Sequence, residues 1–277
     1  MWKYKLALAT IGNSGMDTAE QIKLFAETGF EGFFTDWQPE RTAEFVALAK
    51  SLGTEYQSIH APMNKTDDLW EDDEALAKKG LDELIACLHD CADNEIEIMV
   101  SHCIIGFDHF TPTEIGLERY GRLIDEAEKC GVKIAFENTE GEEYLAAIMD
   151  NFGDNPYVGF CWDTGHEMCY NHSKDLLALY GNNLIATHLN DNLGIRDYGG
   201  KITYVDDLHL LPFDGIADWK YNAERLDKWG FDGFMTFELK YGPSYMRKTN
   251  DCYLKMSFEE YVNECYKRAC KVAYLRK

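Results

Sequence analysis

Short runs of apolar and β-branched residues alternate along the chain with longer segments in which apolar positions recur every three to four residues. The short runs are typical of buried strands, and the longer segments are typical of amphipathic helices. This alternation predicts βαβ units and a parallel sheet. Eight strands are predicted, at residues 5–10, 32–35, 55–60, 96–101, 133–137, 158–162, 184–188 and 233–238.

The segments between the strands have the composition of helices, such as TAEQIKLFAETG and EALAKKGLDELIACLHDCAD. Several of them end at a glycine suited to a helix C-cap, and SFEEYVNECYKRACKVAYL predicts a closing helix after the last strand. Two connections are unusually long, 189–218 after the seventh strand and 240–256 after the eighth. Long ordered loops often bind ligands or cover sites.

Eight strand-helix units in 277 residues predict an α/β fold, a (β/α)8 TIM barrel, with residues 1–277 forming a single domain. A doubly wound open sheet is the alternative. Such a sheet normally has fewer strands, and no G-x-G-x-x-G motif follows the first strand. The chain has no low-complexity segment or linker that would mark a domain boundary.

The composition is that of a globular protein, with 45% hydrophobic residues and a formal net charge of -22. Such a charge repels phosphate backbones, so no nucleic acid partner is expected. The longest apolar runs fall short of the roughly 18 residues of a membrane span, so no membrane partner is expected either. The nine cysteines form no C-x-x-C pair, which favours a reducing, cytoplasmic setting.

Six consecutive predicted strands end in a side chain that can bind a metal ion. In a TIM barrel these strand ends meet at one mouth, where the chemistry of such enzymes takes place. A single histidine or glutamate at a strand end often only hydrogen-bonds a loop, but six together are improbable on that explanation. The six residues are His60, His102, Glu137, Asp163, His188 and Glu238.

The last four of these residues, Glu137, Asp163, His188 and Glu238, come from adjacent strands. Carboxylates that converge in one pocket repel one another unless a cation neutralises them. Three carboxylates and one imidazole suit a divalent ion such as Mn²⁺, Zn²⁺, Mg²⁺ or Co²⁺. A turn at Thr164 and Gly165 is expected to bring His166 over the same mouth, where it binds substrate, binds a second metal or only caps a loop.

These residues resemble those of the xylose isomerase-like TIM barrels, which include sugar isomerases, ketose 3-epimerases and endonuclease IV. The resemblance spans nearly the whole chain. Its most specific pieces are Glu137 followed by Glu143, the D-x-x-H of Asp163 and His166, HLNDN from His188, DLHLLPFDGIADW from Asp207, and FELK with Glu238.

The resemblance to ketose epimerases implies one divalent ion held by the four strand-end residues, with Glu137 and Glu238 also moving protons. It further implies that Glu143 and His166 contact the substrate, together with an arginine from the loop after the seventh strand. Arg196 is the nearest arginine, although its spacing from His188 differs from the family pattern.

The resemblance to endonuclease IV implies a larger ligand set, because His60, His102, Asp207 and His209 complete the pattern of its three-metal site. In a sugar enzyme the three histidines are expected to contact substrate instead. A DNA enzyme lines its mouth with lysine and arginine. The loop after the third strand is acidic in this chain, with Asp67, Asp68, Glu71, Asp72 and Asp73, although part of that run can serve a helix N-terminus.

The sequence therefore predicts a metal-dependent isomerase or epimerase of a small sugar or keto-polyol, acting by carboxylate proton transfer through a metal-stabilised enediolate. No glycine-rich phosphate loop is evident, which favours a non-phosphorylated substrate. The alternatives are an endonuclease IV-like zinc phosphodiesterase on abasic DNA, a dehydratase of a keto-inositol, and a sugar-binding barrel without turnover. A homo-oligomer is also compatible with the aromatic-rich loop after the eighth strand.

Four aromatic residues near the predicted mouth are candidates for stacking on a sugar ring: Trp37, Trp162, Tyr241 and Tyr245. Packing within the barrel is the preferred interpretation for Trp162, which directly precedes a ligand on its strand. His89, His109 and His172 are not expected in the site, because none has a ligand partner at useful spacing.

Overall fold

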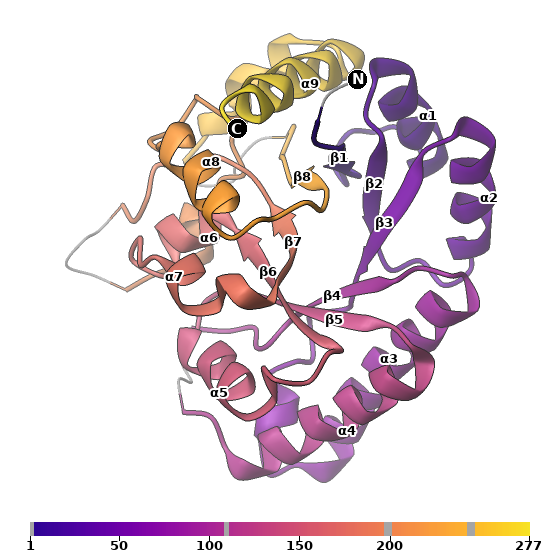
Figure 1. The fold of residues 1–277 in the computed structure, drawn as a ribbon, viewed down its shortest axis with the longest axis vertical. Helices are drawn as coiled ribbons and strands as arrows, with labels where there is room; N and C mark the ends of the chain where they lie inside the picture. Colours follow the sequence, from indigo (N-terminus) through magenta and orange to yellow (C-terminus); the bar gives the residue numbers. More distant parts are fainter. Residues whose placement is uncertain (1–2, 108–110, 197–200, 243–246) are drawn as a thin grey trace.

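A computed structural model describes residues 3–107, 111–196, 201–242 and 247–277. Its centre is one sheet of eight parallel strands in the order β7-β6-β5-β4-β3-β2-β1-β8 (Figure 1). A bridge between Leu189 and Phe237 joins the two ends of this order, so the sheet forms a nearly closed barrel. The strands are β1 Leu6–Ala9, β2 Gly32–Asp36, β3 Glu55–His60, β4 Ile98–His102, β5 Lys133–Glu137, β6 Val158–Asp163, β7 Leu184–His188 and β8 Met235–Phe237. The predicted TIM barrel is confirmed.

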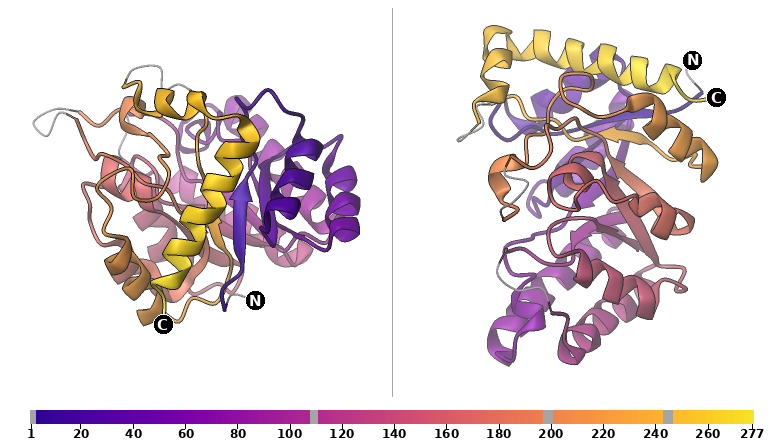
Figure 2. Two further views of the ribbon diagram at one scale, coloured as in Figure 1. Left: turned by 90° about the horizontal axis from the view of Figure 1, so that it is seen from above. Right: turned by 90° about the vertical axis from the view of Figure 1, so that its left-hand side faces the viewer.

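Helices surround the barrel as an outer layer, and the two chain ends lie together at the end opposite the mouth (Figures 1 and 2). The helices are α1 Thr18–Thr28, α2 Thr42–Leu52, α3 Glu74–Asp93, α4 Glu114–Cys130, α5 Glu142–Phe152, α6 Thr164–Cys169, α7 Leu176–Tyr180, α8 Trp219–Lys228 and α9 Phe258–Tyr274. Short 3-10 helices lie at Asp68–Trp70, Gly181–Asn183, Tyr204–Asp206 and Thr249–Lys255. None of the described helices has both the length and the apolar composition that a bilayer crossing requires.

Local sequence signals explain where the helices begin and end. Asp73 and Ser257 cap α3 and α9 with their side chains, and Ser257 forms a capping box with Glu260. Gly29 and Gly131 end α1 and α4 in the left-handed conformation, at φ 117° and 72°, which glycine adopts without a steric penalty. The predicted glycine stops of these helices are confirmed.

The structure differs from the sequence-based expectation after the sixth strand. β6 continues to Asp163, and the predicted turn at Thr164 and Gly165 is instead the first turn of α6. The expectation of a turn was wrong because a glycine in a helix was taken for a turn residue. Gly165 is needed there for a different reason: a Cβ at this position would lie 1.9 Å from Oδ1 of Asn190. Close packing of α6 against the end of β7 therefore excludes a side chain.

The core has two parts, one on each side of the strands. A large apolar layer fills the space between the strands and the helices, with fully buried Phe25, Phe136 and Tyr261 among its members. Inside the barrel lie the small side chains of Val100, Ala135, Cys161 and Ala186, just below the mouth. Small residues leave room near the strand ends for the larger polar side chains above them.

Asp191 fixes the long connection between β7 and α8 over the mouth. Its carboxylate is fully buried and its backbone pairs with Leu210 in an antiparallel bridge. Four donors bond to the carboxylate: the backbone N–H groups of Asn192 (2.9 Å), Phe213 (2.8 Å) and Ala217 (3.0 Å), and Nε1 of Trp219 (2.9 Å). Four donors satisfy a buried carboxylate without a counter-ion. The connection is thus anchored on both sides of Asp207 and His209.

Asp191→Asn is expected to lower the free energy of unfolding by about 2–4 kcal/mol. The substitution replaces one carboxylate oxygen by an NH₂ group, so that two buried donors lose their acceptor and face another donor. Urea unfolding measures the change. Asp232→Asn, an exposed residue before β8, is the matched control and should change the stability by less than about 0.5 kcal/mol. Equal stability of the two variants would contradict the anchoring role of Asp191.

Candidate metal centre at the mouth of the barrel

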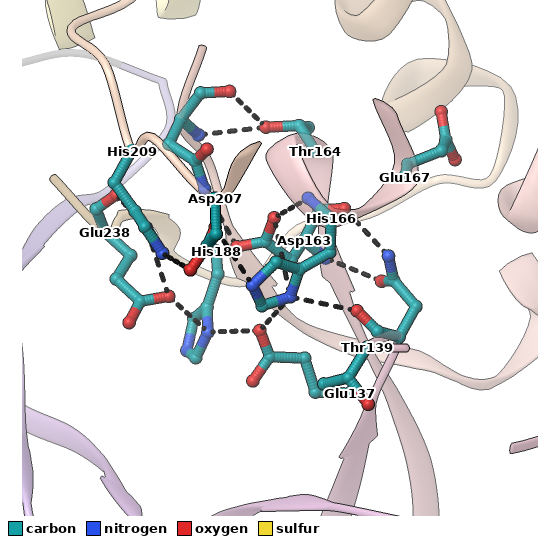
Figure 3. Close-up of polar contacts among 12 residues, drawn as sticks. Glu137, Thr139, Asp163, Thr164, His166, Glu167, His188, Asp207, His209 and Glu238 are labelled. Atoms are coloured by element: carbon teal, nitrogen blue, oxygen red, sulfur yellow. Dashed lines mark hydrogen bonds and ion pairs between the residues drawn. The ribbon is translucent and has the colours of Figure 1, made fainter. Parts of the chain in front are cut away.

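The structure brings nine predicted site residues together at the carboxyl ends of the strands. His60, His102, Glu137, Asp163 and His188 end β3 to β7, and Glu238 directly follows β8. His166 lies in the first turn of α6, while Asp207 and His209 come from the connection that Asp191 anchors. Side chains that are far apart in the sequence therefore share one cluster, most of which Figure 3 shows.

Glu137 is the centre of the cluster, and its side chain is only 1% exposed. Its Oε2 lies 3.4 Å from Nε2 of His60 and 3.4 Å from Nε2 of His102. Its Oε1 lies 3.2 Å from Nδ1 of His166 and 3.2 Å from Nδ1 of His188. One buried carboxylate thus faces four imidazoles from four different elements.

His188 lies between the two glutamates, as Figure 3 shows. Its Nδ1 is 3.2 Å from Oε1 of Glu137 and 3.1 Å from Oε2 of Glu238. Its ring stacks on Phe34 of β2, with ring centroids 4.6 Å apart. The imidazole is therefore held flat against the barrel wall with one nitrogen directed at both carboxylates.

The connection after β7 adds a second set of ligands. Nε2 of His209 lies 2.9 Å from Oδ2 of Asp207, and Nε2 of His166 lies 3.4 Å from Oδ1 of the same residue. His209 has a φ of 47°, an unusual backbone for a residue with a side chain. Its Nδ1 also lies 3.1 Å from the carbonyl oxygen of Glu238, which ties the connection to the end of β8.

The ligand atoms fall into three groups at the mouth, in each of which all atoms lie within 4.8 Å of one another. The groups are His60 with His102 and Glu137; Glu137 with Asp163, His188 and Glu238; and His166 with Asp207 and His209. Both oxygens of Glu137, both nitrogens of His188 and Oδ1 of Asp207 are buried without a hydrogen-bond partner among the described residues. Buried carboxylate oxygens and imidazole nitrogens without partners have lone pairs that can bind divalent cations with mixed oxygen and imidazole ligands.

Cys161 lies below the second group, within the same distance of Glu137 and His188. Burial raises the pKa of this thiol to about 12. The thiol is therefore protonated at neutral pH and is a poor ligand, because metals bind the thiolate. The oxygen and imidazole groups above it are the better candidates.

The charges of the cluster shift the protonation of its members in opposite directions. Burial raises the pKa of Asp163 to about 6. Burial would also raise the pKa of Glu238, but His188 and His209 lower it to about 2. For His209, burial acts to lower the pKa, and the neighbouring Asp207 and Glu238 outweigh it and raise the value to about 9. Without a cation, the cluster therefore compensates its carboxylates by protonating its imidazoles.

Several amide side chains that the sequence did not single out hold the ligands in place. Asn190 donates from Nδ2 to Oδ2 of Asp163 at 2.8 Å, and the backbone N–H of His166 donates to Oδ1 at 2.6 Å. Asn138 donates to the carbonyl oxygen of Asp163 and accepts from its N–H, at 2.9 and 2.8 Å. Partners of this kind fix the orientation of a metal ligand. Asn138 directly follows β5 and Asn190 comes two residues after β7, and this place beside a strand end is the one signal in the sequence that could have identified them.

Two predicted substrate contacts do not interact with the ligand side chains of the cluster in the described structure. Glu143 is exposed in the first turn of α5, and it lines a pocket of about 430 Å³ together with His172 and with Tyr170, whose ring stacks on His166. Arg196 is exposed, and its backbone N–H donates to Asp206 at 3.1 Å. Among the described residues, no ion pair joins either side chain to the nine-residue cluster.

The aromatic residues are largely occupied in packing. Trp162 is fully buried, donates from Nε1 to Glu167 at 2.9 Å and lies under the guanidinium of Arg225, so the packing interpretation is confirmed. Trp37 donates to Asp90 of α3 at 2.8 Å, which directs it away from the mouth. Tyr241 packs on Phe258 and Tyr261 and donates to the carbonyl oxygen of Met256 at 2.6 Å. Stacking on a sugar is therefore not supported for Trp37 or Tyr241.

The predicted Tyr245 and the excluded His109 lie outside the described residues. His89 lies in α3, as expected, and its Nε2 is 2.9 Å from Glu126 of α4 on the outer face of the barrel. His172 is exposed in the loop after α6. None of the described histidines that the sequence left out therefore belongs to the mouth.

A cleft of about 200 Å³ opens beside the cluster, on the side of β1, β2 and β8. Glu238 and His209 form one wall of this cleft, with Asp36 at the end of β2 and Lys240 beyond the end of β8. Glu238 has 27% of its side chain exposed, whereas Glu137 is almost fully enclosed. A small molecule in the cleft therefore contacts Glu238 and not the enclosed Glu137.

Comparison with known proteins agrees with this architecture. A family model described as "Xylose isomerase-like TIM barrel" matches residues 11–256. Among curated proteins, the uncharacterized protein y4fM of Sinorhizobium fredii is 34% identical over 134 residues, which cover 44% of this chain and 40% of that protein. The chain thus matches less than half the length of this relative.

Solved structures with the same fold include sugar epimerases. The zinc-bound IolI protein gives a TM-score of 0.76 at 17% identity, over 97% of this chain and 98% of that chain. D-Psicose 3-epimerase from Clostridium cellulolyticum H10, solved with D-tagatose, gives 0.71 at 14% identity over 99% and 100%. The 3-keto-D-glucoside 4-epimerase from E. coli gives 0.68 at 16% identity over 91% and 98%. At these identities the likeness concerns the fold.

Chelator-treated protein is expected to lose stability as the pH rises from about 6.5 to about 9. The folded pKa of His209 is about 9, above the value of about 6.5 for an unfolded histidine. Protonation of His209 therefore stabilises the fold fully below pH 6.5, and this contribution disappears as the pH passes 9. Urea unfolding across this pH range, in the presence of a chelator, measures the slope.

His209→Asn should reduce that slope, and His172→Asn, which changes an exposed loop histidine, should leave it unaltered. Saturating divalent metal should also reduce the slope, because a cation takes over the charge compensation. A slope that is the same in the His209 variant and the parent protein would show that the imidazole is not charged in the folded cluster.

Proposed function

Because the chain belongs to the xylose isomerase-like TIM barrel family, we propose that it is a divalent-metal-dependent isomerase or epimerase of a small, non-phosphorylated sugar or keto-polyol. The observation that carries the proposal is the placement of Glu137 and Glu238 on two sides of His188, beside a cleft large enough for a small molecule. The sugar epimerases that share the fold support the proposal of a sugar isomerase or epimerase.

The residues proposed to hold the ion are Glu137, Asp163, His188 and Glu238, whose ligand atoms form the largest of the three groups. A bound divalent ion supplies a Lewis acid that polarises a substrate carbonyl and acidifies the neighbouring C–H. The protein groups then carry the proton. One carboxylate removes it from the substrate carbon, and the other returns it to the opposite face, which inverts that carbon.

The two carboxylates differ in their access to water. Glu238 faces the cleft with 27% of its side chain exposed, while Glu137 is 1% exposed and enclosed by four imidazoles. A proton taken up by Glu238 therefore exchanges with solvent, whereas one on Glu137 is shielded. Transfer of a proton between the carbonyl carbon and its neighbour by the same groups gives isomerisation in place of epimerisation.

A zinc phosphodiesterase acting on abasic DNA is the second candidate, and one observation favours it. All nine groups lie together in three sets, so His60, His102 and the set of His166, Asp207 and His209 can hold further ions. The negative charge of the four carboxylates exceeds the positive charge of one divalent ion, whereas the charge of three divalent ions exceeds that of the carboxylates. Only the three-ion site attracts phosphate. The net charge of -22 opposes DNA at the surface of the protein.

Two further alternatives share the same site. A dehydratase of a keto-inositol needs the same deprotonation, followed by loss of a neighbouring hydroxyl group. A sugar-binding barrel without turnover needs the ion and the cleft but no proton transfer. Solvent deuterium at the carbon next to the carbonyl, without loss of water, separates the proposed reaction from both.

The proposal also covers the substrate class, the cellular compartment and the partners of the protein. The substrate is a small carbohydrate, and the nine free cysteines suit a reducing cytoplasm. Nucleic acid and membrane are not proposed as partners, and a homo-oligomer is compatible with the fold. Arg196 and Glu143 are proposed as substrate contacts only if the ligand extends from the cluster to the loops around it.

Glu137→Gln and Glu238→Gln are each expected to reduce hydrogen exchange at the substrate carbon by at least about 10²-fold, because each removes one proton carrier. Metal-loaded protein is incubated with ketoses, aldoses and keto-polyols in D₂O, and deuterium is followed by NMR. Glu118→Gln, an exposed glutamate of α4, is the matched control. Metal content is measured in parallel, since loss of the ion also abolishes exchange. Retained exchange in either variant refutes the two-carboxylate mechanism.

Metal counting separates the sugar enzyme from the phosphodiesterase. The purified protein saturated with Zn²⁺ or Mn²⁺ and then desalted is expected to keep one ion tightly, and to leave an abasic DNA duplex uncut. His102→Ala should then alter neither the ion count nor the DNA result. Three retained ions together with cleavage of the abasic duplex would replace the primary proposal with the second candidate.

A further inference from the structure

The cleft beside the cluster is lined by both acidic and basic side chains. Asp36, at the end of β2, lies in register with His60 of β3. Lys240 lies beyond the end of β8, on the other side of β1, and its N–H donates to His209. Lys240 is the only lysine or arginine among the described residues that line the cleft, which also include Asn13. A substrate in the cleft therefore meets a carboxylate on the β2 side and an ammonium on the β8 side.

Both side chains line the cleft at the strand ends. Along β8, Thr236 faces the barrel interior, where its Oγ1 donates to Gln57, and Phe237 packs in the outer apolar layer. β8 ends at Phe237, and the next three residues, Glu238 to Lys240, all line the cleft beyond it. Asp36 lies on the inward side of β2 two residues after Phe34, whose ring stacks on His188.

The backbone of Lys240 is fixed by two hydrogen bonds, and the side chain that makes one of them is itself anchored by a third. Its N–H donates to the carbonyl oxygen of His209 at 3.0 Å. Its own carbonyl oxygen accepts from Nδ2 of Asn250 at 3.0 Å, and the same amide donates to the carbonyl oxygen of Leu208 at 2.9 Å. Asn250 is fully buried. The lysine is therefore presented from a rigid base, as expected of a residue that positions a ligand.

Lys240 forms no ion pair with the described residues. In these parts of the chain, no carboxylate oxygen lies within the 4.0 Å of an ion pair from its Nζ, although Asp36 and Glu238 line the same cleft. By contrast, Lys65, which is 37% exposed, pairs with Glu83 at 2.6 Å. Lys240 is a half-buried residue, and an ammonium group has three donors to satisfy. An anionic group of a ligand is a suitable acceptor for them.

We propose that the substrate carries a carboxylate, which Nζ of Lys240 binds in the cleft while Asp36 accepts hydrogen bonds from hydroxyl groups on the β2 side. This inference rests on the proposed function and narrows its substrate class to a sugar acid. One lysine in a cleft that also contains Asp36 and Glu238 matches a single negative charge. A phosphate group carries up to two charges and is expected to need a second cation or a helix N-terminus, which the described lining of the cleft does not supply.

The test uses three ketoses that differ only at C6: D-fructose, D-fructuronate and D-fructose 6-phosphate. Exchange of the C3 hydrogen in D₂O is measured with metal-loaded protein, and kcat/KM is compared. The parent protein should favour fructuronate over fructose by about tenfold or more, the range of one charge-assisted hydrogen bond. Lys240→Met should lower this preference ratio at least tenfold, mainly through KM, and Lys240→Arg should restore part of it.

Lys220→Met removes the same charge from the exposed face of α8 and is the matched control, in which the ratio should stay unchanged. Equal rates with fructose and fructuronate, a preference for the phosphate, or an unaltered ratio in the Lys240 variant would overturn the inference. If none of the three sugars exchanges, the proposed function fails for this series. Calorimetry with fructuronate then tests whether Lys240 binds the carboxylate. A tenfold weaker binding to Lys240→Met supports this role, and unchanged binding contradicts it.

Discussion

The burial of Glu137 among four imidazoles is the constraint on which the rest of the mouth depends. A carboxylate that is 1% exposed is costly to ionise unless positive charge surrounds it. His60, His102, His166 and His188 provide that charge when they are protonated, and a divalent ion would provide it when they are neutral. Binding of such an ion would therefore release protons from the cluster. The small side chains below it and the amide network around it keep the ligands in position.

The fold was predictable because it depends on periodicity. The strands lie between the helix layer and the barrel interior and are therefore largely buried and rich in apolar residues, as at Val158–Asp163, which is buried over its whole length. The convergence of the strand-end residues follows from the same fact, since parallel strands in a barrel point to one mouth. The places of Glu137, Asp163, His188 and Glu238 could therefore be expected from the sequence once eight strands were recognised.

What the sequence did not reveal depends on contacts between distant segments. The anchoring of the long connection by Asp191 involves Trp219 and backbone groups that no local pattern identifies. Glu143 and Arg196 are exposed and form no ion pair with the cluster among the described residues, which depends on how α5 and the connection after β7 are placed and not on the residue types. Lys240 was visible only as part of FELK, and its significance lies in the absence of a partner within the described structure.

The cleft and the cluster share Glu238 and His209 and together define one site. Asp36 and Lys240 line the cleft, while Glu137 and His188 belong to the cluster beside it. We propose that Glu137, Asp163, His188 and Glu238 bind one divalent ion, and anomalous diffraction from crystals grown with Zn²⁺ or Mn²⁺ locates such an ion. We expect a peak about 2.0–2.3 Å from a ligand atom of each of these four residues. A mouth without any anomalous peak at saturating metal would show that these residues do not hold a metal.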